Sequence, residues 1–267
     1  MNGHVMAVKN TGNDRQAIQN AIDQAKKQEM GTVVIPEGEW MLDGALRIPG
    51  DMHLILDGAV LRLRDSKDGI LICNSHAFED YGIQIYYVQE HITVSGQNGA
   101  KLLGGTVLFS NVSFSRIEGL EICDAHGFGV ILISTMAVKL LDVTFSGCDN
   151  AVALGVGVRD GFFRNLRGEV KYHFFVMSDF LYEEKRRLHR EHTVFNHIIR
   201  DVDVKAETFA YLYGHHVERI VFCDVRAQVS DVGFRIKQGE HISFSNVQIA
   251  GKCFSDDVKE NAVYVVQ

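Results

Sequence analysis

Four polar residues in the second half of the chain could perform chemistry on an anionic substrate: Asp149, His173, Arg235 and Lys237. Arg235 can bind a carboxylate through two hydrogen bonds, and Lys237 can supply a positive charge or a base. His173 can donate or accept a proton near neutral pH, with Asp149 as its acidic partner. The substrate-binding candidates around them are Asn150, Tyr172, Glu207, Tyr211, Asp231 and His126. The competing interpretation is a solvated strand edge that carries incidental charges.

Short apolar segments recur along the chain and must position these residues. The equivalent positions are taken as Leu120, Leu141, Phe163, Ile198, Ile220 and Ile242, which are separated by steps of 21, 22, 35, 22 and 22 residues. A second strand-like segment follows each of them after about ten residues, as at 210–213 and 233–236. Two short strands per period of 22 residues predict the stacked coils of a parallel β-helix, with those six residues in one inward column. The long step contains a segment at about 179–193, which is either a solvated loop or a wall over the neighbouring face.

One amphipathic helix is predicted ahead of the repeat, at about residues 14–28. Asn13 can cap its first turn. One side carries a narrow apolar stripe, formed by Ala17, Ile18, Ala21, Ile22 and Ala25. We expect this helix to cover the N-terminal end of the solenoid and to block edge pairing there. The predicted fold class is all-β, a single-stranded right-handed parallel β-helix with an N-terminal capping α-helix, forming one domain over residues 1–267. The regular period disfavours the alternative, a β-sandwich.

Three stretches carry a resemblance to a known group of proteins. They are the opening helix with its first strand (residues 13–22 and 31–38), the next coil (residues 51–63), and Gly233-Phe234-Arg235-Ile236-Lys237. The chain resembles the right-handed β-helix proteins of the pectin lyase-like superfamily, especially polygalacturonase-type glycoside hydrolases. This resemblance covers nearly the whole chain and implies the same fold.

The catalytic motifs of that hydrolase group are largely missing. Its Asn-Thr-Asp, Asp-Asp and Gly-His-Gly motifs fall here on residues 148–150, 172–173 and 208–210, and only Arg-Ile-Lys, at 235–237, is unchanged. Glycoside hydrolysis uses two carboxyl groups, so the group's mechanism does not transfer residue by residue. The resemblance predicts a carbohydrate-active enzyme, glycoside hydrolase-like, on acidic glycans or oligosaccharides that contain uronic acid. The alternatives are a lyase or isomerase on the same scaffold, or a non-catalytic β-helix that binds ligands or builds structures.

Composition excludes several other classes. The formal net charge is −7, so the basic surface that a nucleic-acid-binding protein needs is missing. No apolar run approaches the length of a membrane span, and no apolar leader is visible, so we expect a cytoplasmic protein. The five cysteines show no zinc or disulfide spacing and should be reduced. We expect neither a metal nor a cofactor. A homo-oligomer is possible, because no helix is predicted to cap the C-terminal end.

Overall fold

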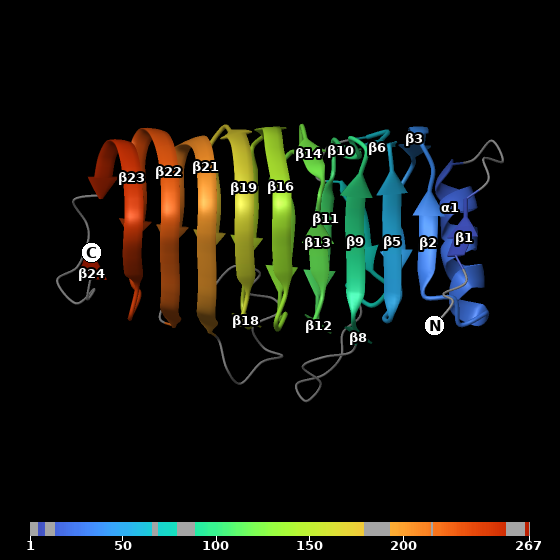
Figure 1. Ribbon diagram of the computed structural model, residues 1–267. Helices are drawn as coiled ribbons and strands as arrows, with labels where there is room; N and C mark the ends of the chain where they lie inside the picture. Colours follow the sequence, from blue (N-terminus) through green and yellow to red (C-terminus); the bar gives the residue numbers. More distant parts are fainter. Residues whose placement is uncertain are drawn as a thin grey trace.

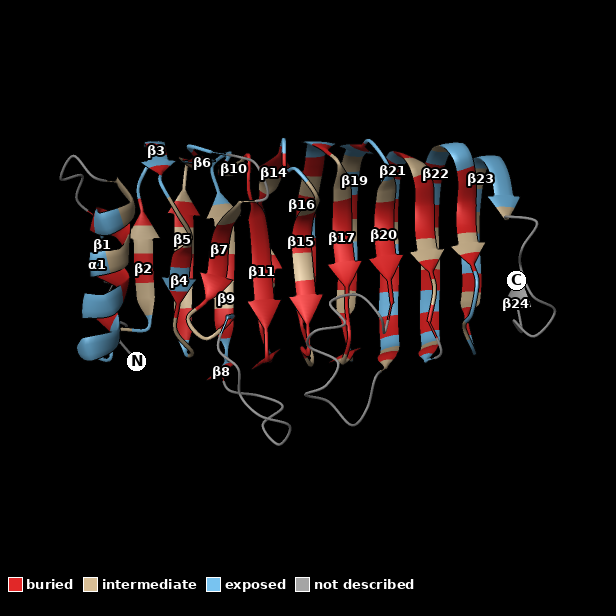
Figure 2. Ribbon diagram, turned by 180° about the vertical axis from the view of Figure 1, so that it is seen from behind, coloured by how far each residue is buried: buried red, intermediate tan, exposed pale blue. Residues whose placement is uncertain are grey.

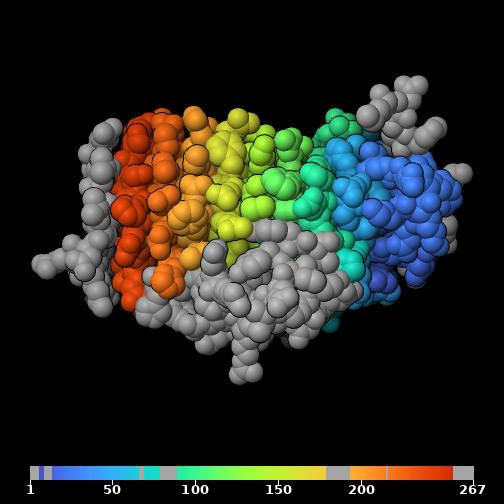
Figure 3. Space-filling view, turned by 90° about the horizontal axis from the view of Figure 1, so that it is seen from below, coloured from blue at the N-terminus to red at the C-terminus, as the bar shows by residue number. Residues whose placement is uncertain are grey.

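The computed structural model is a stack of parallel β-coils, and it describes residues 5–8, 14–65, 69–78, 89–178, 193–214, 216–254 and 265–266. About nine coils follow one another along a single axis, with the helix at one end (Figure 1). The sequence therefore runs in order along the length of the molecule (Figure 3). This confirms the predicted all-β parallel solenoid. The predicted segment at 179–193 lies outside the described residues, apart from Thr193.

Each coil has three strand faces, which we call face 1, face 2 and face 3 in chain order. Face 1 holds β2 (Thr32–Ile35), β5 (Met52–Asp57), β9 (Ile92–Gln97) and β13 (Arg116–Glu118), with β1 (Val5–Ala7) and β24 (Val265–Val266) at its two ends. Face 2 holds β3 (Gly38–Leu42), β6 (Ala59–Leu63), β10 (Lys101–Leu103) and β14 (Glu121–Cys123). Face 3 holds β4 (Leu46–Ile48), β7 (Ile70–Asn74), β11 (Thr106–Ser110), β15 (Phe128–Ile133), β17 (Asn150–Leu154) and β20 (His173–Met177).

Later strands are longer because they bend around corners without interruption. β16 (Lys139–Cys148) and β19 (Phe162–Val170) each span faces 1 and 2. Three strands cover all three faces: β21 (Val194–Leu212), β22 (Val217–Ile236) and β23 (Ser243–Phe254). Short strands mark the corner from face 3 back to face 1: β8 (Gln89–Glu90), β12 (Val112–Ser113) and β18 (Val158–Arg159). Twenty-two of the strands belong to one hydrogen-bonded sheet, so a residue's register partner identifies its neighbour on the next coil.

The helix α1 (Asp14–Lys27) is close to its predicted range, and its buried residues are the five predicted from the stripe. Asp14 lies at the positive end of the helix dipole, and Lys26 and Lys27 lie at the negative end. The Asp14 carboxylate also accepts a hydrogen bond from the Met41 amide, at 2.7 Å. The apolar stripe and this bond hold α1 across the first coils. Asn13, the predicted cap, lies outside the described residues.

The corner between faces 1 and 2 is built from residues with left-handed backbone conformation. They form one column across successive coils, with φ between 51° and 66°: Gly119, Asp142, Asn165, Asp201, Asp224 and Asn246. Asp and Asn tolerate this conformation better than other side chains do. The side chains also bond between coils, because Asn165 donates to Asp142 at 2.7 Å and Asn246 donates to Asp224 at 2.8 Å. Residue type therefore fixes where each coil turns.

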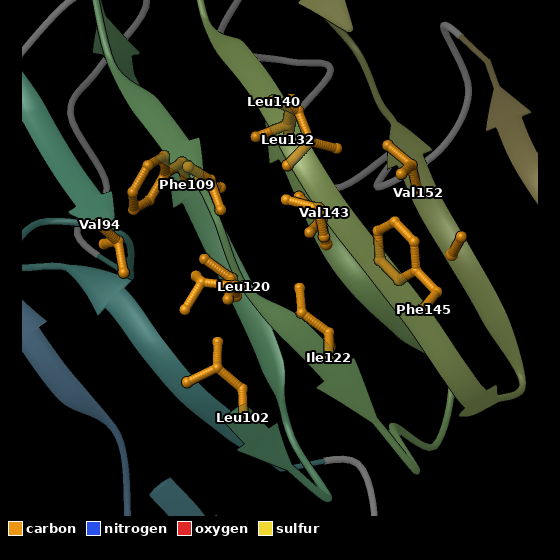
Figure 4. Close-up of a cluster of buried hydrophobic side chains, with 14 of the residues drawn as sticks. Val94, Leu102, Phe109, Leu120, Ile122, Leu132, Leu140, Val143, Phe145 and Val152 are labelled. Atoms are coloured by element: carbon orange, nitrogen blue, oxygen red, sulfur yellow. The ribbon is translucent and has the colours of Figure 1, made fainter. Parts of the chain in front are cut away.

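The core changes character along the axis. Its first half is packed mainly with aliphatic side chains such as Leu102, Leu120 and Ile122, with Phe109 among them (Figure 4), and phenylalanines become frequent from Phe145 onward. Phenylalanines then stack from coil to coil, and Phe222 lies 5.6 Å from Phe244 with nearly parallel rings. Each fully buried phenylalanine contributes about 1.5–3 kcal/mol through burial alone. The C-terminal coils, which carry most of the predicted site residues, therefore have a densely packed aromatic core beneath those residues.

The predicted inward column is wrong at several positions. Ile198 is 43% exposed, and Leu141 lies in the outer row of face 1 beside Arg164. The inward column is instead Leu140, Phe163, Ile199, Phe222 and Phe244. Its steps are 23, 36, 23 and 22 residues, so the turns differ in length by one residue. A shift of one residue moves a side chain to the other face of a strand, and periodicity alone could not detect it.

Candidate functional site

The candidate site lies on the outer surface of face 3, on β20, β21 and β22. Val176, Tyr211 and Arg235 are register partners on these three strands and form an outer row. Tyr213 and Lys237 come two residues after Tyr211 and Arg235, directly beyond the ends of β21 and β22, and they share the same outer surface, because both contact the Tyr211 ring. Two tyrosines and two cations thus form a square across two adjacent coils.

Upstream of this square, the outer surface of face 3 is apolar and buried. The outer row continues through Cys73, Leu108, Ile131, Ala153 and Val176; Ile131 is half-buried and the other four are at most 6% exposed. Figure 2 shows this face in red along β11, β17 and β20. An outer strand surface normally faces water, so burial on both surfaces is a distinctive feature of this face. The polar square begins where the apolar row ends, between β20 and β21.

Tyr211 is the centre of the site. Its ring centroid lies 4.7 Å from that of Tyr213, 5.9 Å from the Arg235 guanidinium carbon and 5.5 Å from Lys237 Nζ. Arg235 also donates to the Asp231 carboxylate, from Nη2 to Oδ2 at 2.6 Å. The face of a tyrosine ring can contact either a sugar ring or a cation, because it is apolar and electron-rich. The arrangement therefore offers an aromatic platform beside two positive charges.

His173 borders this platform on the preceding coil. Its ring lies 5.7 Å from the Tyr211 ring, and its register partner on β21 is Thr208. Burial lowers the pKa of His173 below its ordinary value; the nearby charge of Arg235 acts in the same direction, and Glu207 and Asp231 oppose it. The imidazole is therefore neutral at physiological pH and can accept a proton.

Three buried polar atoms at this site have no hydrogen-bond partner among the described residues: His173 Nδ1, Thr208 Oγ1 and Arg235 Nε. They come from three successive coils. An unpaired buried polar group costs about 1–3 kcal/mol, so three in one region are a strong indication that something else bonds there. A bound ligand or ordered water would satisfy them. Thr208 is fully buried, which makes it the most costly of the three to leave unpaired.

Asp149 belongs to a second group, near the corner from face 2 to face 3. Its carboxylate accepts a hydrogen bond from the Gly127 amide at 3.2 Å and lies 3.8 Å from His126 Nδ1. Asn150 joins the two groups, because its side chain donates to the Gly127 carbonyl at 2.8 Å and accepts from the His173 amide at 3.1 Å. The Asp149 carboxylate therefore stabilises a turn, and the Asn150 side chain fixes the position of the first residue of β20.

The predicted residues are thus divided between two clusters. The structure brings His173, Arg235, Lys237, Tyr211 and Asp231 together, and Glu207 is close enough to act on the pKa of His173. Asp149, Asn150 and His126 form the other cluster. Tyr172 is 38% exposed and stacks under Lys171, whose Nζ lies 4.5 Å from the ring centroid. Tyr213 was not selected among the binding candidates, although its i, i+2 spacing from Tyr211 matches that of Arg235 and Lys237. Thr208 was not selected either, and no spacing pointed to it.

A separate hollow of about 270 Å³ lies beside the corner of faces 1 and 2, where it is lined by Asp203, Asp224 and Arg226 among others. It does not contain any of the predicted site residues. Its charged walls are partly bonded within the chain, since Arg200 lies 3.8 Å from Asp224. Within the described ranges, no cluster of histidine, cysteine and acidic side chains could hold a metal ion. α1 is too short and polar to cross a membrane, and no other described helix could do so.

Comparison with known proteins places the chain among the parallel β-solenoids. No protein-family model matches the sequence, and a comparison with curated proteins gives no match. Among solved structures, the surface adhesin PfbA of Streptococcus pneumoniae is similar, with 12% identity, a TM-score of 0.56, and coverage of 91% of this chain and 79% of that chain. These values establish a shared fold.

Two further structures are similar over just over half of their own length. The iota-carrageenase of family GH82 from A. fortis has 14% identity and a TM-score of 0.57, covering 87% of this chain and 55% of that chain. A mutant tailspike protein of E. coli bacteriophage HK620, in complex with a pentasaccharide, has 10% identity and a TM-score of 0.56, covering 99% and 57%. Carbohydrate-active and carbohydrate-binding proteins are thus prominent among the solved structures that share this fold.

Proposed function

We propose that this protein binds an acidic glycan on the outer surface of face 3 and acts on it by moving a proton. The observation that carries the proposal is the cluster of Tyr211, Arg235, Lys237 and His173, with three unpaired buried polar atoms beside it. The carbohydrate-related neighbours support a sugar ligand. Membership in the pectin lyase-like superfamily is part of the same proposal.

The cluster suits a uronic acid better than a neutral sugar. Tyr211 and Tyr213 would contact the apolar face of a sugar ring, while Arg235 and Lys237 would neutralise its carboxylate. Neutralising that carboxylate makes the neighbouring C5 proton more acidic. The neutral His173 imidazole could then accept this proton. Departure of the oxygen at C4 would complete an elimination, with the Tyr211 hydroxyl supplying the proton that the leaving oxygen requires.

This chemistry fits the site better than hydrolysis by paired acids. Hydrolysis requires one carboxyl group that remains protonated until it donates to the leaving oxygen. The Asp149 carboxylate instead accepts from the Gly127 amide, and the Asp231 carboxylate accepts from Arg235. Both carboxylates are thus already engaged as hydrogen-bond acceptors within the chain. We therefore favour the lyase or isomerase alternative over the hydrolase one.

Binding and turnover of defined oligosaccharides test the proposal. Oligomers of galacturonic, mannuronic and guluronic acid would be compared with neutral oligomers of the same length. Calorimetry measures binding, and ultraviolet absorbance measures an unsaturated product. Arg235→Ala should weaken binding by about 10- to 100-fold, as expected for a charged hydrogen bond. His173→Ala should preserve most of the affinity and reduce turnover by about 10²- to 10⁴-fold.

Matched controls come from the other faces. Arg62→Ala on face 2 and Lys139→Ala on face 1 remove exposed cations that lie outside the cluster. Both should leave binding within a factor of about two. Equal binding of neutral and acidic oligomers would contradict the role of Arg235 and Lys237. Binding without any turnover would support the non-catalytic alternative, and no binding to any glycan would refute the proposal.

A further inference from the structure

A second exposed tyrosine lies beside the proposed site, at the corner from face 2 to face 3. Tyr172 directly precedes His173, whose ring lies 5.7 Å from that of Tyr211. The Tyr172 amide donates to the Asp149 carbonyl on the preceding coil at 2.8 Å, and the Tyr172 carbonyl accepts from the Thr208 amide on the next coil at 2.9 Å. The backbone is therefore bonded on both sides, although Tyr172 remains 38% exposed. The corner thus holds an aromatic ring at a fixed position on the surface.

Lys171 supplies the positive charge at this corner, with Nζ 4.5 Å from the Tyr172 ring centroid. The Tyr172 hydroxyl and, to a smaller extent, the Asp149 carboxylate raise the pKa of Lys171, so the ammonium group is charged at neutral pH. The pairing of β20 with β21 places Glu207 opposite Tyr172 on the next coil. Two carboxylates thus accompany one ammonium group, and His126 offsets Asp149 only when it is protonated. The charge balance of the corner therefore disfavours an additional anion.

The Tyr211 cluster has the opposite balance, because it holds two cations, Arg235 and Lys237, beside the Asp231 carboxylate. We propose that the Tyr172 corner is a second sugar subsite that takes a neutral unit, so that the ligand is a mixed glycan with uronic acid and neutral sugars in one chain. This inference rests on the proposed function, in which the Tyr211 cluster holds the uronic acid. The Tyr172 ring would contact the apolar face of the neutral sugar, whose hydroxyls can donate to carboxylates and accept from an ammonium group.

The spacing of the two tyrosines sets the length of ligand that contacts both. Tyr211 comes four residues after Glu207, which lies opposite Tyr172 on the adjacent coil. At about 3.3 Å per residue and about 4.8 Å per coil, the two tyrosines lie roughly 14 Å apart, the length of about three sugar units. A disaccharide therefore reaches one of the tyrosines, whereas a tetrasaccharide reaches both. Affinity should rise with the length of the neutral part of the ligand.

Calorimetry with xylo-oligosaccharides that carry one glucuronic acid on the terminal xylose tests the subsite. A series with one, two and three xylose units keeps the charge constant while the neutral part grows. Wild-type affinity should rise by about tenfold or more along the series, and Tyr172→Ala should weaken binding of the longest member by about 5- to 30-fold and of the shortest by less than about twofold. Tyr172→Phe should retain the rise.

A matched control removes an aromatic side chain in a similar setting on the N-terminal coils. Phe78 is 53% exposed, and the Arg47 guanidinium carbon lies 5.9 Å from its ring centroid. Phe78→Ala should leave every affinity in the series unchanged. Circular dichroism and thermal unfolding establish that each variant is folded.

Removal of a carboxylate tests the preference for a neutral unit. Tetragalacturonic acid would bring a carboxylate to the corner, where Glu207 repels it. Glu207→Gln should therefore strengthen binding of tetragalacturonic acid by about two- to fivefold, the range of an exposed charge pair. The same variant keeps an acceptor oxygen and should leave binding of the longest mixed oligosaccharide within a factor of about two.

The outcomes separate this inference from the proposed function. If affinity does not rise with xylose number, or if the rise survives Tyr172→Ala, the second subsite is overturned. The proposed function still stands in that case, provided that Arg235→Ala weakens binding of the shortest member. Unchanged binding of tetragalacturonic acid by Glu207→Gln would overturn the neutral assignment. If the wild-type protein binds neither the mixed series nor any oligouronate, both proposals are overturned.

Discussion

His197 should make the stability of the solenoid depend on pH. It is fully buried in β21, where Nδ1 accepts a hydrogen bond from the Gly161 amide at 3.0 Å and Nε2 donates to the Val158 carbonyl at 3.2 Å. Burial lowers the pKa of His197 from 6.5 to about 4. The unfolded chain therefore binds a proton below pH 6.5, whereas the folded chain does not until about pH 4. Stability from this group is fully present above pH 6.5 and is lost as the pH falls towards 4.

The size of the effect follows from the pKa difference. At 1.36 kcal/mol per pKa unit, lowering the pH from 7.5 to 4.5 should remove about 2–3 kcal/mol of unfolding free energy through His197. Urea unfolding at both pH values measures the loss. His197→Gln can keep both hydrogen bonds but cannot titrate. The unfolding free energy that this variant loses between pH 7.5 and pH 4.5 should therefore be about 2–3 kcal/mol smaller than the loss in the wild-type protein. Other titrating groups affect both proteins equally. If the wild-type protein and the variant lost equal unfolding free energy, the conclusion that His197 is buried in its neutral form would be refuted.

Three more predictions concern packing and thiols. Ile199→Ala should lower the unfolding free energy by about 2–5 kcal/mol, because it leaves a cavity in the core, while Ile198→Ala should lower it by under about 1 kcal/mol. Urea unfolding measures both values, and the opposite order would mean that Ile198 is the inward residue. Gly168→Ala should lower the unfolding free energy by roughly 4 kcal/mol, as a severe core defect does. The reason is that φ is +117° and the added methyl would overlap the Phe145 carbonyl oxygen. An unchanged thermal unfolding midpoint would contradict this. A thiol reagent should label exposed Cys253 fastest in the native protein and all five cysteines after denaturation; fewer than five would reveal a disulfide.

The fold was predictable because its signals are local and repeated. The stripe of α1 and the 22-residue period are both visible in the sequence, and each independently predicts its element. The inward column was not predictable, because turns that differ by one residue place Ile199 inward in place of Ile198. Periodicity identifies a strand, but hydrogen-bond register determines its inner surface.

The candidate site was predictable only in part, for the same reason. Arg235 and Lys237 could be identified from an intact Arg-Ile-Lys motif, and Tyr211 could be placed beside them by counting coils. Whether the Thr208 hydroxyl has a hydrogen-bond partner depends on which groups surround it after folding, and residue spacing does not reveal this. The role of Asp149 in a turn likewise depends on a hydrogen bond from the Gly127 amide, which lies close to the carboxylate only in the folded chain.

The coil-by-coil register has a consequence for how the chain folds. Most stacked partners are 21–23 residues apart, such as Val33 and Leu54, however many coils the solenoid contains. Only a few junctions are longer, such as Met52 with Ile92, which are 40 residues apart. The extra loop-closure entropy there is only about 0.5 kcal/mol, since it grows with the logarithm of length. Contact order is therefore low for an all-β protein, at roughly 0.1, a value typical of fast-folding helical domains. The rate of folding should depend on closing the first coils, and each later coil should then add to a template that already exists.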